Sequence, residues 1–469
     1  MRPIRAEVPA AAQSTTKLLA ALIVGGITAI LDTTIVAIGI HTLTVQLHAT
    51  ISTIQWVSTG YLLALAVAIP LVPWAQARFG GKRLWLFGLG LFVVGSVLCA
   101  CAWNPASLIG FRILQGLGGG IMFPLMQTLA MQHIEREAMA RTMAVVSLPI
   151  ALGPILGPVL GGFVLNWLDW RWLFLINVPV GVTGLVLALL YIKRDQPQRK
   201  EPVQRLDVIG VVLLVPALAG LLYALSNVHA AGGFGRSDVL LPGIGGAMLL
   251  AGFTAWAIRR AGAALVDLRL LGVRSVRASS ITLVAVGAVL LASTFLLPLF
   301  LQELRGYGVL DAALLLIPQG VGSLLARVVA GKLVDQFGAR WVAVVGFMVI
   351  AAATVPFALA NTGTSLWLLE TSLFVRGLGL GVVLIPVMTV AYLDIRPEQM
   401  PHASAITRIV QQLGGAFGTA LIAVVLTAAA TRTNPAAGYA AAFWWTTAIT
   451  GAAIGLSLLL PARNESLER

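Results

Sequence analysis

The chain consists mainly of long apolar segments separated by short polar ones. A helix needs about 20 predominantly apolar residues to cross the hydrocarbon core of a bilayer, and fourteen segments meet this requirement. They cover residues 17–40, 52–73, 83–103, 106–128, 141–164, 172–192, 207–227, 240–259, 278–301, 310–331, 341–360, 366–390, 404–428 and 440–461. Only 10% of the residues are charged, against about 25% in soluble domains. The sequence therefore predicts an all-α membrane protein with fourteen transmembrane helices.

The basic residues indicate the orientation of these helices. The net charge of +13 comes from residues between apolar segments, so we interpret it as a topology signal and expect no nucleic-acid partner. With both termini in the cytoplasm, 23 of the 31 Lys and Arg residues lie in cytoplasmic segments, as the positive-inside rule requires. The others lie in outer loops (Arg171, Arg236, Arg305 and Arg432) or within helices (Arg112, Arg327, Arg376 and Arg408). We expect a multi-pass protein of a bacterial inner membrane.

Tryptophan supports the same boundaries. All twelve Trp residues lie near a predicted helix end, as expected for aromatic belts at the two membrane surfaces. The first apolar segment also exceeds the core of a signal peptide, which has about 7–15 residues. It is therefore expected to stay in the protein as a spanning helix.

Two sequence matches indicate an internal repeat. ARFGGKR at 77–83 is similar to DQFGARW at 335–341, and GLGGG at 116–120 is similar to GLGLG at 377–381. Both offsets, 258 and 261 residues, correspond to eight helices, which predicts two six-helix halves with two helices inserted between them. The expected division is a cytoplasmic N-terminus (1–16), a first half (17–192), a linker (193–206), an inserted pair (207–259), a cytoplasmic loop (260–277), a second half (278–461) and a cytoplasmic tail (462–469).

Several chemistries have no support in the sequence. GLGGG lies inside an apolar helix and does not follow a strand, so it is not a phosphate-binding loop. Cys99 and Cys101 are two residues apart on one helix and point to different faces, which argues against a disulfide or a metal site. We expect no cofactor, no metal and no enzymatic activity.

Eight motifs together resemble the major facilitator superfamily, in particular its fourteen-spanner drug:proton antiporters. They are LDTTIV (31–36), QWVSTGYLL (55–63), FRILQGLGGG (111–120), LGPILGPVLGG (152–162), WRWLFLINVPVG (170–181), LPLFLQELRGY (297–307), AGKLVDQFGAR (330–340) and ASAITRIVQQLGGAFG (403–418). The resemblance implies a monomeric secondary transporter that exports small amphipathic or hydrophobic compounds against protons by alternating access. A proton-coupled importer on the same fold and a non-transporting sensor or scaffold are alternatives.

Asp32 is the leading candidate for proton coupling. An ionised carboxylate at the bilayer centre costs about 2.5–3.5 kcal/mol on insertion scales, so it needs water, a partner or a proton there. Arg112, which the resemblance links to proton transfer, and Gln115 one turn later are the candidate partners. The alternatives are a carboxylate that locks helices together through Thr33 or Thr34, and an arginine that only neutralises an acid.

A stripe of small residues recurs along the fifth segment. Glycine at every fourth position gives one smooth helix face, and the resemblance implies that this antiporter motif packs the helix against the other half. Ordinary packing, unrelated to transport direction, is the alternative. The residues of the motif are Gly153, Pro154, Gly157, Pro158, Gly161 and Gly162.

The inner loops after the second and tenth segments resemble the gating signature of the family. The second half matches it well, whereas Ala77 stands in the first half where an acid is expected. Anchoring by the positive-inside rule is the alternative role for the basic residues. The candidate gating residues are Arg78, Gly80, Lys82, Arg83, Gly331, Asp335, Gly338 and Arg340.

Further polar side chains are candidates for the substrate cavity. They are Gln55, Trp56, Tyr61 and Asn177. Glu370 and Arg376 in the twelfth segment offer a second proton site, with contact to lipid headgroups as the alternative for Glu370. The sequence does not identify the substrate.

Overall fold

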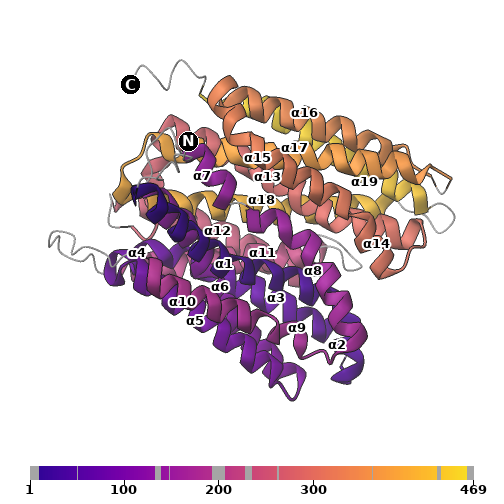
Figure 1. The fold of residues 1–469 in the computed structure, drawn as a ribbon, viewed down its shortest axis with the longest axis horizontal. Coiled ribbons are helices and arrows are strands. Elements are labelled where there is room, and N and C mark those ends of the chain that lie inside the picture. The colour runs from indigo at the N-terminus through magenta and orange to yellow at the C-terminus, as the bar shows by residue number, and fades with distance from the viewer. Residues whose placement is uncertain are drawn as a thin grey trace, which may run out of the picture.

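A computed structural model describes residues 10–49, 51–132, 139–146, 148–192, 206–227, 235–260, 264–361, 363–429 and 435–461. Within these ranges all regular structure is helical. Figure 1 shows a bundle of long helices, with the N-terminal helices in indigo to magenta and the C-terminal helices in orange to yellow. The expected linker at 193–206 and tail at 462–469 lie almost wholly outside the described residues.

The helices form two groups and an intervening pair. The first half comprises α1 (Ala10–Ile38), α2 (Ile40–Gln46), α3 (Ile51–Ala68), α4 (Val72–Phe79), α5 (Gly81–Ala100), α6 (Pro105–Met131), α7 (Met139–Val146), α8 (Leu148–Trp167), α9 (Trp172–Leu175) and α10 (Asn177–Tyr191). The pair is α11 (Val208–Asn227) and α12 (Ser237–Arg259). The second half comprises α13 (Arg274–Leu299), α14 (Val309–Leu315), α15 (Ile317–Phe337), α16 (Ala339–Ala358), α17 (Leu366–Leu393), α18 (Met400–Ala429) and α19 (Pro435–Ser457).

Twelve helical segments of the described chain are long and apolar enough to cross a membrane. They coincide with twelve of the fourteen predicted segments. The other two predicted positions, 141–164 and 440–461, are occupied by α8 and α19, which are not among the twelve. The prediction of an all-helical, multi-pass protein is confirmed, and the number of fourteen spans stays a prediction.

The internal repeat is visible in the backbone of the two turns that end α4 and α15. Gly80 ends α4 with φ +85°, and Gly338 ends α15 with φ +83°. This left-handed conformation favours glycine because a Cβ would crowd the backbone. Two residues later, the Nζ of Lys82 donates to the carbonyls of Leu189 and Ile192 at 2.7 and 2.6 Å. The Nε of Arg340 likewise donates to the carbonyl of Leu460 at 2.6 Å, so each cation caps the last helix of its own half.

The glycine-rich motifs of α6 and α17 make the same close approach in both halves. A Cβ at Gly116 would overlap the carbonyl oxygen of Tyr61 on α3, and a Cβ at Gly377 would overlap that of Gln319 on α15. The absence of a side chain therefore sets the helix spacing at both places. The motif GLGGG therefore serves close helix packing.

The buried apolar side chains divide the bundle into two ends. One cluster joins both halves at the end of the bundle that holds the Gly80 and Gly338 turns, which we call the shared-core end. At the opposite end each half has a cluster of its own, and we call this the split-core end. Polar contacts also join the halves at the shared-core end: Thr128 and Ser404 share a hydrogen bond of 2.8 Å, and Tyr392 donates to Gln127 at 3.3 Å.

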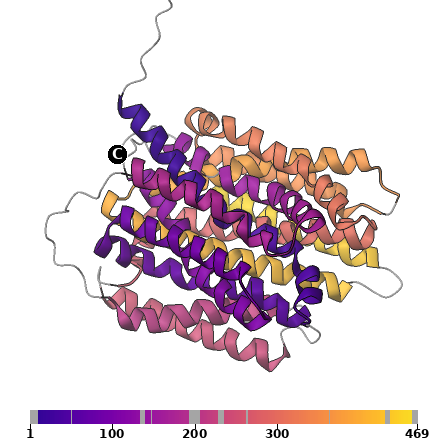
Figure 2. The same cartoon turned by 60° about the horizontal axis from the view of Figure 1, so that its bottom comes forward.

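The inserted pair α11 and α12 lies at the edge of the bundle, seen at the bottom of Figure 2. Helix α11 packs against α3 and α18, so it touches both halves. Asp207 connects the pair to the loop after it, because its carboxylate accepts hydrogen bonds from the Nε1 of Trp256 and the amide of Leu265, both at 3.0 Å.

The aromatic-belt interpretation is wrong for Trp85. Its side chain is fully buried in the shared core, where a Cβ at Gly25 would come within 2.8 Å of the indole. The missing side chain at Gly25 leaves the slot that the ring fills. Proximity to a helix end therefore does not place a tryptophan at the membrane surface.

Candidate functional site

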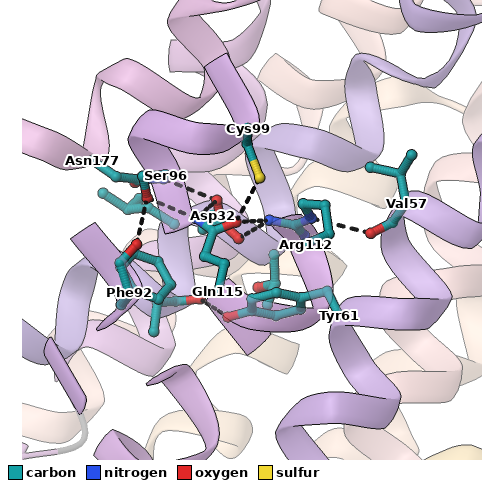
Figure 3. A network of polar contacts seen from close by, with 12 residues as sticks. Asp32, Val57, Tyr61, Phe92, Ser96, Cys99, Arg112, Gln115 and Asn177 are labelled. Carbon is teal, nitrogen blue, oxygen red and sulfur yellow. Dashed lines mark hydrogen bonds and ion pairs between the residues drawn. The ribbon is translucent and has the colours of Figure 1, made fainter. Parts of the chain in front are cut away.

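Asp32 lies on α1 at the level where the shared core ends, between Ile30 of the shared core and Ile35 of the split-core end. Its side chain is fully buried. Figure 3 shows three donors around the carboxylate. The Nη1 of Arg112 forms an ion pair with Oδ2, and Oδ1 accepts from the Nε2 of Gln115 at 3.0 Å and from the Nδ2 of Asn177 at 2.9 Å. Helices α1, α6 and α10 thus meet at one carboxylate.

Helix α6 supplies two of these donors because its N-terminus is firmly set. The side chain of Asn104 accepts from the amide of Ser107 at 2.8 Å, and Ser107 caps the amide of Asn104 in return at 3.2 Å. This reciprocal capping fixes the start of the helix. Arg112 and Gln115 are three residues apart and therefore lie on one face of α6.

A second layer holds these donors in place. Gln115 also donates to the hydroxyl of Ser96 on α5 at 2.7 Å, and its Oε1 accepts from Arg112 at 2.7 Å and from the thiol of Cys99 at 3.7 Å. The Nε of Arg112 donates to the carbonyl of Val57 at 3.1 Å. The network therefore reaches from α1 to α3, α5, α6 and α10 within the first half.

Aromatic rings enclose the arginine of the pair. The guanidinium carbon of Arg112 lies 4.1 Å from the ring centre of Tyr61 and 5.8 Å from that of Phe174. The hydroxyl of Tyr61 donates to the carbonyl of Ala29 at 3.3 Å, one turn before Asp32. Both members of the ion pair are thus removed from solvent in this conformation, with 0% and 1% of their side chains exposed.

The neighbouring threonines do not hold the carboxylate. The hydroxyl of Thr33 donates to the carbonyl of Ile30 at 2.7 Å, and that of Thr34 donates to the carbonyls of Leu31 and Gly153 at 2.9 and 3.0 Å. The sequence alternative, in which Asp32 locks helices through Thr33 or Thr34, does not match these contacts.

The predicted cavity residues fall in different places. Tyr61 and Asn177 join the Asp32 network, as described above. Trp56 is 39% exposed, and its ring lies 5.7 Å from that of Tyr223 on the inserted helix α11. The side chain of Gln55 lies outside the described part of the chain.

The small-residue stripe on α8 contacts both halves. Within the first half, a Cβ at Gly153 or Gly157 would overlap Ile30 or Thr34 on α1. Near the end of α8, a Cβ at Gly162 would come within 3.3 Å of Leu310 on α14 of the second half. Gly161 is buried, and the side chains of Pro154 and Pro158 lie outside the described residues.

The candidate gating residues lie at the two turns that end α4 and α15. Gly80, Gly338, Lys82 and Arg340 set the geometry described for the repeat. The remaining members divide by exposure: Gly331 is buried, whereas Arg78, Arg83 and Asp335 are exposed, and so is Ala77, where an acid was expected.

Arg376 is the centre of a second buried cluster, in the other half. Its side chain is 1% exposed. Its Nε donates to the hydroxyl of Thr354 at 3.1 Å, its Nη1 to the Oε1 of Gln319 at 2.8 Å, and its Nη2 to the hydroxyl of Ser293. All three partners are neutral, and Glu370 is not among them.

Sequence reasoning missed Ser96, Cys99 and Phe174 as members of the first cluster. The internal repeat offered one signal for Ser96. Its counterpart at the offset of 258 residues is Thr354, whose hydroxyl accepts a hydrogen bond from Arg376 as the hydroxyl of Ser96 accepts one from Gln115. Cys99 and Phe174 had no such signal.

Comparisons with known proteins agree with these features. The family profile of the Major Facilitator Superfamily matches residues 22–419. The chain is 37% identical over 407 residues to a "Multidrug resistance protein B homolog" of Mycobacterium tuberculosis, covering 86% of this chain and 75% of that protein. It is 30% identical over 400 residues to the "Putative multidrug resistance protein MdtD" of Serratia proteamaculans, covering 84% of this chain and 82% of that protein.

Solved structures share the fold at low sequence identity. The proton:xylose symporter XylE superposes with a TM-score of 0.68 at 15% identity, covering 94% of this chain and 95% of that one. The human organic anion transporter MFSD10 superposes with a TM-score of 0.67 at 14% identity, covering 96% and 100%. The chain is therefore a multi-pass membrane transporter and not an enzyme, and it belongs to the major facilitator superfamily.

Proposed function

We propose that this transporter is a proton-coupled antiporter that exports small amphipathic or hydrophobic compounds by alternating access. The names of the relatives, which are multidrug resistance proteins, support export of drug-like compounds. The single observation that carries the proton coupling is the buried Asp32 carboxylate, held by three donors from two other helices.

The chemistry of those donors links a proton to helix movement. An ionised carboxylate only accepts hydrogen bonds, whereas a protonated one must also donate. The three atoms that face Asp32 are all donors, from Arg112, Gln115 and Asn177. A proton on Asp32 would therefore displace at least one of them and weaken the contact of α1 with α6 or α10. Arginine keeps its proton, so Arg112 would stabilise the charged state and the carboxylate would carry the proton.

The two ends of the bundle fit an alternating-access cycle. We infer that the termini lie in the cytoplasm of a bacterial cell and that the chain works as a monomer in the inner membrane. The shared-core end then faces the cytoplasm and is closed by Thr128, Ser404, Gln127 and Tyr392. The split-core end faces outward, where Asp32 would receive its proton once the donors around it separate.

The same inference assigns fourteen spans. Helices α8 and α19, with 20 and 23 residues, would complete the twelve segments. They pack against α1 and α16 inside the bundle. The halves at 17–192 and 278–461 would each have six spans, and the pair at 207–259 would add two.

The test is substrate transport by Asp32→Asn in inverted membrane vesicles with an imposed pH gradient. We expect the variant to lose proton-driven accumulation of an amphipathic dye and dye-induced proton release, while its expression is kept. Asp169→Asn is the matched control, because Asp169 is half-exposed and pairs with Arg171 at the surface. Full proton-driven transport by the Asp32 variant would remove this carboxylate from the mechanism.

The same vesicles test the direction. Inverted vesicles have an acidic interior during respiration, so an exporter accumulates dye in exchange for protons. Dye that leaves with the protons instead would indicate the alternative, a proton-coupled importer.

A further inference from the structure

The membrane-embedded interior holds more positive than negative charge. Arg112 is neutralised by Asp32. Among the described residues, neither Arg376 nor Arg408 has an acidic ion-pair partner, although both lie inside membrane-spanning helices. Arg376 is buried and Arg408 is partly buried, and a charge removed from water without a partner is costly, so each of these cations needs an explanation.

The two unpaired arginines differ in what surrounds them. Arg376 uses all three of its nitrogens in hydrogen bonds within the second half. Arg408 donates only through Nη1, to the Oε1 of Gln411 on its own helix at 3.0 Å. Its Nε is buried and has no hydrogen-bond partner among the described residues. Arg376 is therefore satisfied by the protein, and Arg408 is not.

Arg408 lies where the two halves meet. It belongs to α18 of the second half, and its guanidinium carbon is 4.4 Å from the ring centre of Phe123 on α6 of the first half. Ile406, two residues earlier, is in the shared core, and so is Phe123. Arg408 therefore lies at the edge of the shared core, beside the interface that rearranges in an alternating-access cycle.

Arg408 also contacts a helix of the proton site. The guanidinium of Arg408 stacks on Phe123 of α6, and Arg112 of the proton site lies on the same helix. Helix α6 thus contacts the unpaired cation through Phe123 and carries the arginine of the Asp32–Arg112 pair.

We propose that Arg408 binds the anionic group, a carboxylate or sulfonate, of the transported amphipathic compound, a refinement that rests on the proposed antiport function. Stacking on Phe123 fixes the plane of the guanidinium and leaves its Nε without a hydrogen-bond partner among the described residues. The Nε edge of the guanidinium donates two parallel hydrogen bonds to a carboxylate or sulfonate. Phe123 at the same place offers an apolar surface to the aromatic part of the ligand.

The proposal has a consequence for energetics. Export of a monovalent anion against one proton moves two positive charges inward, whereas export of a neutral analogue moves one. The membrane potential then drives the anion more strongly than the neutral compound. The anionic class is favoured because the described interior offers an unpaired cation and no unpaired acid.

Two arylamine probes test the proposal on the full-length protein in lipid nanodiscs. The first, 8-anilinonaphthalene-1-sulfonate, carries a sulfonate, and N-phenyl-1-naphthylamine is the same framework without it. Fluorescence titrations, corrected with empty nanodiscs, give saturable binding of each probe. We expect Arg408→Gln to weaken sulfonate binding at least about tenfold, since a charge-assisted hydrogen bond contributes this much, and to leave binding of the neutral probe unchanged.

Two further variants separate charge recognition from a packing role. Arg408→Lys keeps the charge but loses the planar edge, so we expect partial recovery of sulfonate binding. Arg171→Gln removes a half-exposed surface cation and should change neither titration. An equal loss of both probes in Arg408→Gln would overturn the proposal in favour of packing against Phe123.

The wild-type protein alone also decides the question, whatever the stability of the variants. Preferential, saturable binding of the sulfonate supports the proposal, and equal affinity for both probes or no saturable sulfonate binding overturns it. Failure of proton coupling is a separate result. If sulfonate binding depends on Arg408 but the protein shows no proton-driven transport, the antiport proposal is wrong and the anion site is still supported.

Discussion

The two halves contain equivalent polar clusters that differ in one decisive respect. The pairs Ser96 and Thr354, and Tyr61 and Gln319, are each 258 residues apart, and Gln115 and Arg376 are 261 apart, the offsets of the sequence repeat. In the first half, the amide of Gln115 bridges Ser96 and a carboxylate on α1. In the second half, a guanidinium bridges Thr354 and a hydroxyl on α13.

The first cluster contains a group that can change its charge, the carboxylate of Asp32, whereas the second contains one that cannot, the guanidinium of Arg376. A carboxylate gains and loses a proton, whereas arginine stays charged. The same helix packing therefore holds a titratable acid in one half and a fixed cation in the other. The comparison teaches that the repeat conserves spacing between helices and leaves the chemistry of each cluster free to diverge.

The largest effect that tests this contrast is expected from Arg112→Gln. The variant leaves Asp32 buried without its cation, which costs about 3–5 kcal/mol of unfolding free energy. We expect a large fall in the thermal unfolding temperature of the purified protein, together with loss of proton-driven transport. The double variant Asp32→Asn/Arg112→Gln removes both charges and should be more stable than Arg112→Gln alone; a double variant that is less stable would contradict the ion-pair account.

Arg376→Gln should have a smaller effect. Among the described residues, Arg376 has no acidic partner that the substitution would leave unpaired. The variant loses hydrogen bonds to neutral groups, which costs about 1–3 kcal/mol of unfolding free energy. We expect moderate destabilisation in the same unfolding assay, with proton coupling retained at reduced rate. Complete loss of coupling in a folded Arg376 variant would show that the second cluster is more than a static element.

The turns at Gly80 and Gly338 should respond alike, with effects no larger than that of Arg376→Gln. Gly80 and Gly338 have nearly the same φ and ψ, in a region that is essentially restricted to glycine, so alanine costs about 1–3 kcal/mol at either place. Equal shifts of unfolding temperature in Gly80→Ala and Gly338→Ala are the expected result. Gly90→Ala is a suitable control, because nothing lies within 4 Å of a Cβ built there. Clearly unequal shifts would mean that one turn bears strain that the other does not.

The smallest effect concerns the two cations that cap helix ends. Lys82→Met and Arg340→Met each remove a charge from the last carbonyls of a helix, a change of about 0.3–1 kcal/mol. Both variants should fold and retain most of their transport. A transport defect in Arg340→Met alone would instead favour a gating role confined to the half that has Asp335.

Much of the fold was readable from the sequence. Apolar runs of helical length predicted helices at all fourteen positions, and the matching offsets of the Gly80 and Gly116 motifs predicted the repeat. Arg112 and Gln115 could be grouped in advance because three residues separate them on one helix. Asp32 was identifiable because a carboxylate is rare at that depth.

Only the tertiary structure decided which helix faces meet. It placed Asn177 and Ser96 in the Asp32 network, put Trp85 in the core and Trp56 against the inserted pair, and brought Arg408 to the interface between halves. The physical reason is that lipid and protein interior are both apolar, so the hydropathy of a membrane helix does not reveal which of its faces is buried. The sequence determines the helices and their order, because the backbone must form its hydrogen bonds within each helix in a membrane. Which helices pack together depends on the shape of their surfaces and on the few polar side chains that need a hydrogen-bond partner.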